Sequence, residues 1–113
     1  MRVVLTPIWA AAPDRALPVW FVTSVALERV QVEGHVVVVP KAHIDDLNSM
    51  YRDGKMSIMG DMYRAAFEVA RIKGIDHRGF RTVVNNGGEG GQIIWHLHMH
   101  VLGGKKLGDG LAG

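Results

Sequence analysis

Three histidines stand at alternate positions near the C-terminal end of the chain, as His96, His98 and His100. Side chains alternate between the two faces of a strand, so these imidazoles would share one face, about 7 Å apart at twice the rise of one strand residue. An imidazole titrates close to neutral pH and can attack an electrophile, donate a proton or accept one. The spacing therefore predicts a row of groups suited to nucleophilic or acid–base chemistry.

Three interpretations fit this row of histidines. The row could be a solvated strand face without a chemical role. It could bind zinc, iron or copper, which a His-x-His pair suits, although the segment itself contains no carboxylate. It could also attack phosphorus through one imidazole while the neighbouring imidazoles orient it and move protons. The glycine-rich stretch at residues 86–92 favours the third interpretation, because amide and backbone N–H groups stabilise charge on phosphate oxygens.

The composition limits the classes of function that the chain can serve. Its 113 residues, 48% hydrophobic and 21% charged, predict one globular domain over residues 1–113. The net charge is only +2, and Lys105 and Lys106 are the one basic pair that stands out, so we expect no nucleic-acid partner. No stretch approaches the ~18 apolar residues of a membrane span, and we expect no membrane partner.

The chain contains no cysteine. That absence excludes a disulfide framework, a thiolate zinc site and a cysteine nucleophile. It also suits a reducing compartment, and we expect a cytoplasmic protein.

The elements that must position the histidines follow from the apolar pattern. Four valines at residues 36–39 predict a strand that is buried on both faces. Residues 55–73 predict the main helix, because polar side chains recur there at steps of three and four, and Gly74 follows as a C-cap. Two further strands are predicted at residues 80–85 and 93–102.

The packing of these elements follows from the same pattern. Trp95, Leu97, Met99 and Val101 alternate with the histidines and would form an apolar face against the helix, which is itself expected to be heavily buried outside its polar stripe. Residues 1–33 contain three prolines, which exclude a long helix there; residues 19–22 and 25–27 could form one or two edge strands. The order of elements indicates an α+β domain with one main helix on an antiparallel sheet.

The same segments resemble the histidine triad, or HIT, family of nucleotide-binding proteins. The alternation of histidine and apolar residues from His96 is preceded by Gly-Gly-Gln and followed by Gly-Gly. The run from His35 to Ile44 resembles the family's strand and its Pro-Lys-x-His segment, and residues 80–87 resemble its asparagine-bearing strand and turn. The match covers residues 35–106 and is strongest to the purine-nucleoside phosphoramidase branch.

The resemblance implies a role for each histidine of the row. His98 would attack the α-phosphorus and form a nucleotidyl-histidine intermediate that water hydrolyses, while the main-chain carbonyl of His96 accepts its other ring proton. His100 would contact phosphate oxygens or the leaving group, and His43 would match a remote histidine that supports the triad. This scheme requires no metal and no cofactor. The residues expected near the phosphate are Asn85, Gly91 and Gln92.

Three features depart from the family pattern. Ile93 stands where relatives carry a hydroxyl residue, and Leu27 stands where they carry an aspartate that binds the ribose. Residues 108–113 lack the aromatic and proline residues common in this branch, and residues 1–33 diverge as a whole. A lost charged ribose contact costs about 1.5–3 kcal/mol, or one to two powers of ten in affinity. We therefore expect weaker nucleoside binding with the chemistry at phosphorus retained.

These features predict a homodimeric hydrolase that cleaves nucleoside 5′-phosphoramidates or related purine nucleotide conjugates through His98. The dimer is implied by the resemblance, in which the sheets of two subunits join, and an unpaired strand edge would gain from being covered. One alternative is a nucleotide-binding regulator whose turnover is vestigial. Another is a metalloprotein that uses the same histidines. His35 and His77 are expected to be structural.

Overall fold

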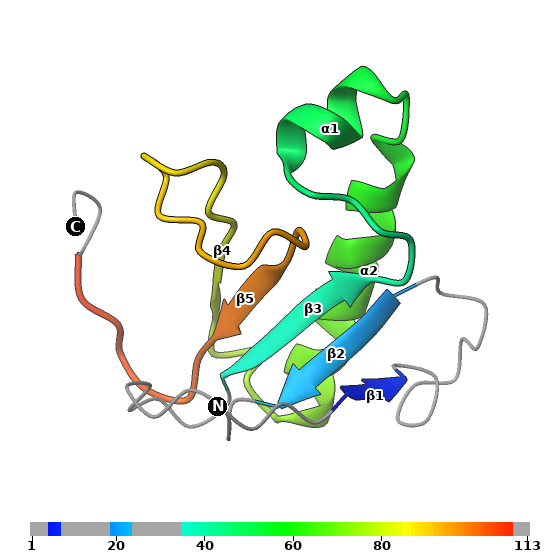
Figure 1. Ribbon diagram of the computed structural model, residues 1–113. Coiled ribbons are helices and arrows are strands. Elements are labelled where there is room, and N and C mark those ends of the chain that lie inside the picture. Colours follow the sequence, from blue (N-terminus) through cyan, green and yellow to red (C-terminus); the bar gives the residue numbers. More distant parts are fainter. Residues whose placement is uncertain (1–4, 8–18, 24–34, 110–113) are drawn as a thin grey trace.

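The computed structural model describes residues 5–7, 19–23 and 35–109 (Figure 1). Within these ranges five strands form one antiparallel sheet in the order β1-β2-β3-β5-β4, and two helices accompany it, which confirms the α+β class. The strands are β1 (Leu5–Pro7), β2 (Val19–Thr23), β3 (Val36–Pro40), β4 (Arg81–Val83) and β5 (Met99–Leu102); the helices are α1 (Leu47–Arg52) and α2 (Ser57–Ile72).

The valine strand β3 lies in the middle of the sheet, between β2 and β5. Val36, Val37 and Val38 are all buried, so the prediction of a strand covered on both faces is confirmed. β-Branched side chains suit this position because they pack closely on a pleated surface. The register places Val36 opposite Val101 and Val37 opposite His100, so β3 fixes the position of the last histidine of the row.

The N-terminal part of the sheet differs from the prediction. Residues 19–22 do form a strand, β2, but it pairs with a neighbour on each side rather than lying at the edge. The edge position is taken by β1, which the sequence did not predict. The second stretch proposed there, residues 25–27, lies outside the described residues, as does Leu27 itself.

The helix α2 covers one face of the sheet (Figure 1). Its Met62, Ala65, Ala66 and Val69 belong to the core together with side chains from β3 and β5, and the small alanines let the helix approach the sheet closely. The expectation that the helix is heavily buried outside its polar stripe was wrong for some of its apolar residues, because the sheet covers only one side of it. The apolar side chains left 42–60% exposed on or beside the helix are Met56, Phe67 and Ile72.

The chain reverses direction sharply after α2. Gly74 follows the helix with φ +72°, a left-handed conformation that glycine adopts without a steric penalty, so the predicted helix end is confirmed. The N–H of Ile75 then donates to the carbonyl of Ala70 at 2.9 Å. Ile75 is thereby returned to the buried interior, next to the last strand.

The strand predicted at residues 93–102 is shorter than expected, since β5 begins only at Met99. Leu97 and Met99 are fully buried, but Trp95 is 51% exposed, so the prediction of an apolar face beginning at Trp95 was wrong. The physical reason is that residues 92–97 form no strand ladder and are held instead by hydrogen bonds to the loop after β3. His96 and His98 therefore precede the strand.

The candidate site lies at one end of this sheet. The loop after β3, the helix α1 and the connection between β4 and β5 gather at the same end of the molecule (Figure 1). Among the helices of the described residues, none is long and apolar enough to cross a membrane. The fold thus places three irregular segments around the start of β5.

Candidate active site

His98 and His100 lie side by side where the chain enters β5. Their ring centroids are 5.1 Å apart, with the edge of one ring toward the face of the other. His100 is on β5, between Met99 and Val101, which both pack into the core with α2. Because neighbouring strand residues point to opposite faces, His100 lies on the face of the sheet away from α2.

The hydrogen bond made by His98 fixes which ring nitrogen carries the proton. Its Nδ1 lies 2.8 Å from the main-chain oxygen of His96. A carbonyl oxygen only accepts, so Nδ1–H is the donor and the neutral ring keeps its lone pair on Nε2. The contact implied by the family resemblance is present, and it leaves the lone pair of Nε2 free.

The side chain of His96 holds the histidine segment against the end of β3. Its Nε2–H donates to the main-chain oxygen of Pro40 at 2.9 Å, at the end of β3. The next residue, Leu97, donates its N–H to the carbonyl of Ile44 at 2.7 Å. These two bonds tie the histidine segment to the loop after β3 and so hold the carbonyl that orients His98.

His100 is paired with a histidine that sequence reasoning left as structural. Nε2 of His35 lies 2.9 Å from Nδ1 of His100, and the two rings stack at 5.2 Å between centroids. The missed signal was the strand pairing: Val37 lies opposite His100, and His35 precedes Val37 by two residues, which puts it on the same face. Pairing β3 with β5 in this register is enough to place His35 beside His100.

Both members of this pair are neutral at physiological pH. Burial lowers the pKa of His35, and burial, reinforced by His98 and His35, lowers the pKa of His100 to about 4. Nδ1 of His35 is buried and has no partner among the described residues, and a buried unpaired acceptor costs less than a buried unpaired N–H. We therefore assign Nε2–H of His35 as the donor, which leaves the ring proton of His100 on Nε2.

His43 lies beside a different member of the row. Its Nε2 contacts a carboxylate oxygen of Asp45 at 2.8 Å, and its side chain is 73% exposed. Its ring meets the ring of His96 edge to face, with centroids 5.3 Å apart. The structure thus brings His43 to the triad next to His96, while His35 is the residue that bonds His100; the supporting role of His43 stays a prediction.

The glycine-rich connection is shaped by Asn85. Its Nδ2 donates to the carbonyl of Gly90 at 2.8 Å, which closes the turn. A side chain at Gly90 would overlap the main chain of Asn86, and Gly91 has φ +86°, so both positions require glycine. Asn85 and Gly91 were expected near the phosphate, and the structure places them at the turn just ahead of the histidine segment.

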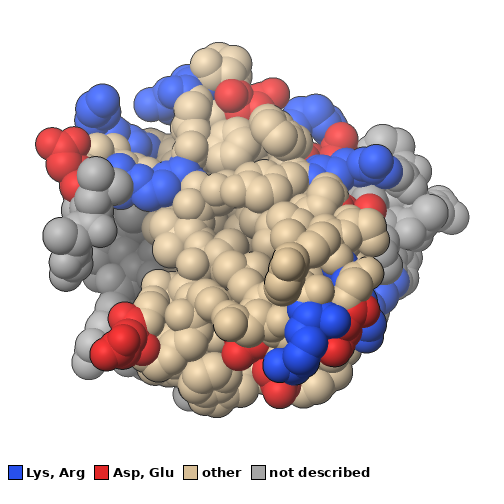
Figure 2. Space-filling model, turned by 90° about the horizontal axis from the view of Figure 1, so that it is seen from above, with Lys and Arg blue, Asp and Glu red and all other residues tan. Residues whose placement is uncertain are grey.

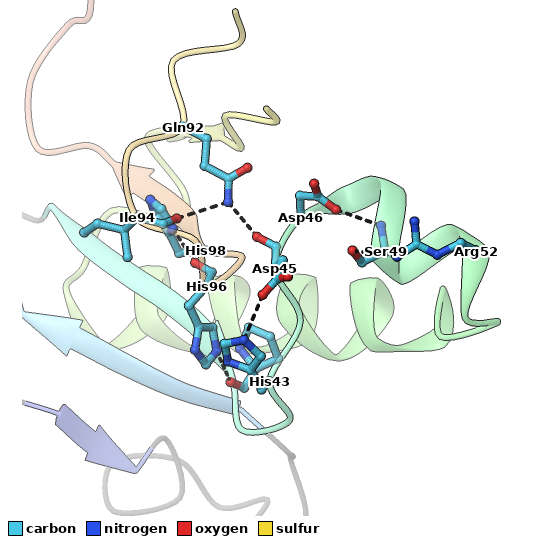
Figure 3. A network of polar contacts seen from close by, with 10 residues as sticks. His43, Asp45, Asp46, Ser49, Arg52, Gln92, Ile94, His96 and His98 are labelled. Atoms are coloured by element: carbon cyan, nitrogen blue, oxygen red, sulfur yellow. Dashed lines mark hydrogen bonds and ion pairs between the residues drawn. The ribbon is translucent and has the colours of Figure 1, made fainter. Parts of the chain in front are cut away.

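Gln92 is the most buried of the residues expected to bind substrate, at 4% exposed. Figure 3 shows its amide between the loop after β3 and the histidine segment. Nε2 donates to the main-chain oxygens of Asp45 and Ile94 at 2.6 and 3.0 Å. Oε1 accepts from the N–H of Gly87 at 2.9 Å.

An apolar run follows Gln92. Ile93 is 85% exposed, and Ile94 and Trp95 are also exposed. Ile93 therefore presents a side chain without a hydrogen-bond donor at the position where a hydroxyl residue was expected from the family. Residues 110–113, the other departure from the pattern, lie outside the described part of the chain.

Charged side chains gather at the margin of the face that is seen from above in Figure 2, and its centre is uncharged.

Among the described residues, no group of three or more histidine, cysteine, aspartate or glutamate side chains is arranged to hold a metal ion. The metal-binding alternative therefore has no support in the arrangement of the described side chains.

Comparison with known proteins identifies the family. The sequence profile of the HIT domain family matches residues 22–107. The chain belongs to the HIT family. The purine nucleoside phosphoramidase of Escherichia coli is similar to this HIT protein, with 34% identity over 82 residues, which are 73% of this chain and 68% of that enzyme.

Two further comparisons agree with this assignment. An uncharacterized HIT-like protein of Chlamydia muridarum is 42% identical over 79 residues, which are 70% of this chain but only 61% of that relative. The solved structure of a histidine triad protein from Clostridium difficile superposes with a TM-score of 0.77 at 31% identity, covering 96% of this chain and 85% of that one. The described residues of this HIT protein therefore share the fold of its family.

Proposed function

We propose that this HIT protein hydrolyses nucleoside 5′-phosphoramidates or related purine nucleotide conjugates, with His98 as the nucleophile. The observation that carries the proposal is the 2.8 Å bond from Nδ1 of His98 to the carbonyl of His96. It fixes the tautomer whose Nε2 lone pair can attack phosphorus, and a fixed, correctly oriented nucleophile is what covalent catalysis requires. The similarity to the phosphoramidase of Escherichia coli supports the choice of substrate.

The proposed reaction has two displacements at the same phosphorus. In the first, Nε2 of His98 forms a bond to the α-phosphorus while the bond to the leaving amine breaks; the amine keeps that electron pair and takes a proton from solvent. In the second, water attacks phosphorus, the bond to Nε2 breaks, and the proton lost by water returns to solvent. The N–H on Nε2 of His100 donates to a phosphate oxygen or the leaving group, where it stabilises developing charge.

The test is a comparison of His98→Ala with His77→Ala. His77 is exposed and pairs with its neighbour Asp76, so it serves as a histidine control away from the site. With a fluorogenic purine nucleoside phosphoramidate, loss of the nucleophile should lower kcat/KM by roughly a thousandfold or more, whereas His77→Ala should match the wild type. Turnover that survives in His98→Ala would sink the nucleophile assignment.

A second candidate is a nucleotide-binding regulator with vestigial turnover. The exposed Ile93 favours it, because an isoleucine cannot give the phosphate the hydrogen bond that a hydroxyl would. Saturable binding of a purine monophosphate, measured by calorimetry, together with a kcat that is the same in wild type and His98→Ala would support this candidate over the hydrolase.

We also propose that two copies of the chain join along β4. This strand is an edge of the described sheet, and an unpaired edge is a template for a further strand. The aromatic side chains beside it are exposed: Phe67 packs on Phe80 at 5.5 Å between centroids, and the hydroxyl of Tyr63 contacts that of Thr82 at 3.2 Å. Sedimentation should show a dimer that Phe67→Glu dissociates; a monomeric wild type at micromolar concentration would contradict this.

A further inference from the structure

The side chain of Gln92 has no hydrogen-bonding capacity left for a bound phosphate. A primary amide has two N–H donors and one carbonyl oxygen. Both donors are directed at main-chain oxygens, those of Asp45 and Ile94, and the carbonyl accepts from Gly87. With only 4% of the residue exposed, turning the amide toward substrate would break its bonds to both main-chain oxygens.

The three partners of Gln92 belong to three different segments around the site. Gly87 is in the glycine-rich turn. Asp45 is in the loop after β3, and Ile94 is in the segment that carries the histidines (Figure 3). The loop and the histidine segment are also joined through His96 and Leu97. Gln92 adds a connection to the glycine-rich turn at Gly87, in addition to the bonds that Asn86 makes to Leu47 and Asn48 at the start of α1.

The geometry points to Gln92 as a positioning residue that holds the glycine-rich turn at a fixed distance from His98, rather than as a ligand of the substrate. This inference rests on the proposed hydrolysis at His98. The turn would supply backbone N–H groups to the phosphate, and His98 would supply the nucleophile, so the two must keep their relative position in the transition state. Loss of the amide should then slow the chemical step for every substrate alike.

The main test replaces Gln92 by methionine, which has similar length and no hydrogen-bonding amide. Two phosphoramidates of the same nucleoside are compared, one with an arylamine and one with an alkylamine leaving group. We expect kcat to fall roughly ten- to a hundredfold, by the same factor for both substrates, with KM changed less than about threefold. His77→Ala, the exposed control away from the site, should behave as wild type.

Direct contact with substrate would give a different pattern. If Gln92 bonds the leaving group, the loss will be much larger for the alkylamine, which needs more assistance to depart. If it binds the phosphate, KM will rise while kcat stays near that of the wild type. Either result would overturn the inference.

Hydrogen exchange supplies a readout that needs no activity. The N–H of Gly87 bonds to the Gln92 carbonyl oxygen, so its exchange should accelerate at least severalfold in Gln92→Met, and unchanged exchange would refute the connection. If wild type and His98→Ala are equally inactive, the proposed function fails, yet this exchange measurement still decides whether Gln92 holds the turn.

If Gln92→Met does not fold, Gln92→Glu provides a second test of the positioning role. A carboxylate keeps the acceptor for Gly87 but places a charged oxygen against the carbonyls of Asp45 and Ile94, and this repulsion and burial raise the pKa of the introduced carboxyl. The protonated form regains one donor. We expect the activity of Gln92→Glu relative to wild type to rise as pH is lowered from 8 to 6, whereas a constant ratio would contradict the positioning role.

Discussion

Acidification from pH 7 to pH 5 should lower the free energy of unfolding through His100. Burial, and then His98 and His35, lower the pKa of this imidazole from 6.5 to about 4 in the folded protein. Within this window the unfolded chain binds a proton at His100 and the folded chain does not. His100 therefore has little effect on the free energy of unfolding above pH 6.5 and lowers it progressively as pH falls toward 4.

The magnitude follows from the two pKa values. One pH unit inside the window corresponds to about 1.4 kcal/mol for one proton, so the loss between pH 7 and pH 5 is about 2 kcal/mol. That is a large part of the 5–15 kcal/mol typical of a domain's unfolding free energy. Working above pH 5 keeps most carboxylates ionised in both states and leaves the histidines as the main source of the pH dependence.

The assay is urea unfolding of wild type and His100→Asn at pH 7 and pH 5. Asparagine keeps an acceptor close to the position of Nδ1, where His35 donates, but it does not titrate. We expect the loss in wild type to exceed that in His100→Asn by about 2 kcal/mol, and part of the remaining loss to come from His35, whose pKa is lowered by burial.

Two results would refute this reasoning. One is an equal loss of stability in wild type and His100→Asn between pH 7 and pH 5. The other is an imidazole titration of His100, followed by NMR, with a midpoint at or above 6.5. Either would mean that His100 is not desolvated in the folded protein.

Three further changes test the rest of the site. Gly90→Ala should destabilise the protein by about 1–3 kcal/mol, because the added methyl overlaps the main chain of Asn86; Gly88→Ala, where the space is open and φ is not positive, should have a much smaller effect in thermal unfolding. His96→Phe should lower kcat about ten- to a hundredfold by releasing the carbonyl that orients His98, the proposed nucleophile, and an unchanged kcat would show that the bond from His96 to Pro40 is dispensable. Ile93→Ser should bind a nucleoside monophosphate about three- to tenfold more tightly in calorimetry if its hydroxyl reaches the phosphate; equal affinity would place residue 93 away from it.

The sequence pattern was sufficient to predict the elements that depend on the types of residues close together in the chain. The valines of β3 form a buried strand because β-branched side chains suit no other setting so well. The helix α2 was predicted within two residues at its N-terminal end, and its stop at Gly74 was predicted from the conformational freedom of glycine. The three histidines were also identified from sequence, although only His100 lies in a strand, so strand alternation does not place His96 and His98.

Which apolar side chains of α2 are buried could not be predicted from the sequence pattern. The polar stripe marked the solvated side, but an apolar side chain is buried only if another element reaches it. The sheet reaches Met62 and Val69 and leaves Phe67 and Ile72 exposed. That outcome depends on how far the sheet extends under the helix, which no periodicity encodes.

The candidate site likewise combines features that the local sequence indicates with contacts that only the tertiary structure forms. The residue types and order from His96 to His100 resemble the histidine triad, and that resemblance implied the contact from His98 to the carbonyl of His96, only two residues away. The pairing of His35 with His100 joins positions 65 residues apart, and the anchor from His96 to Pro40 joins positions 56 apart. Only the tertiary structure decided these contacts, because a side-chain hydrogen bond depends on where two distant segments meet and leaves no periodic trace in either one.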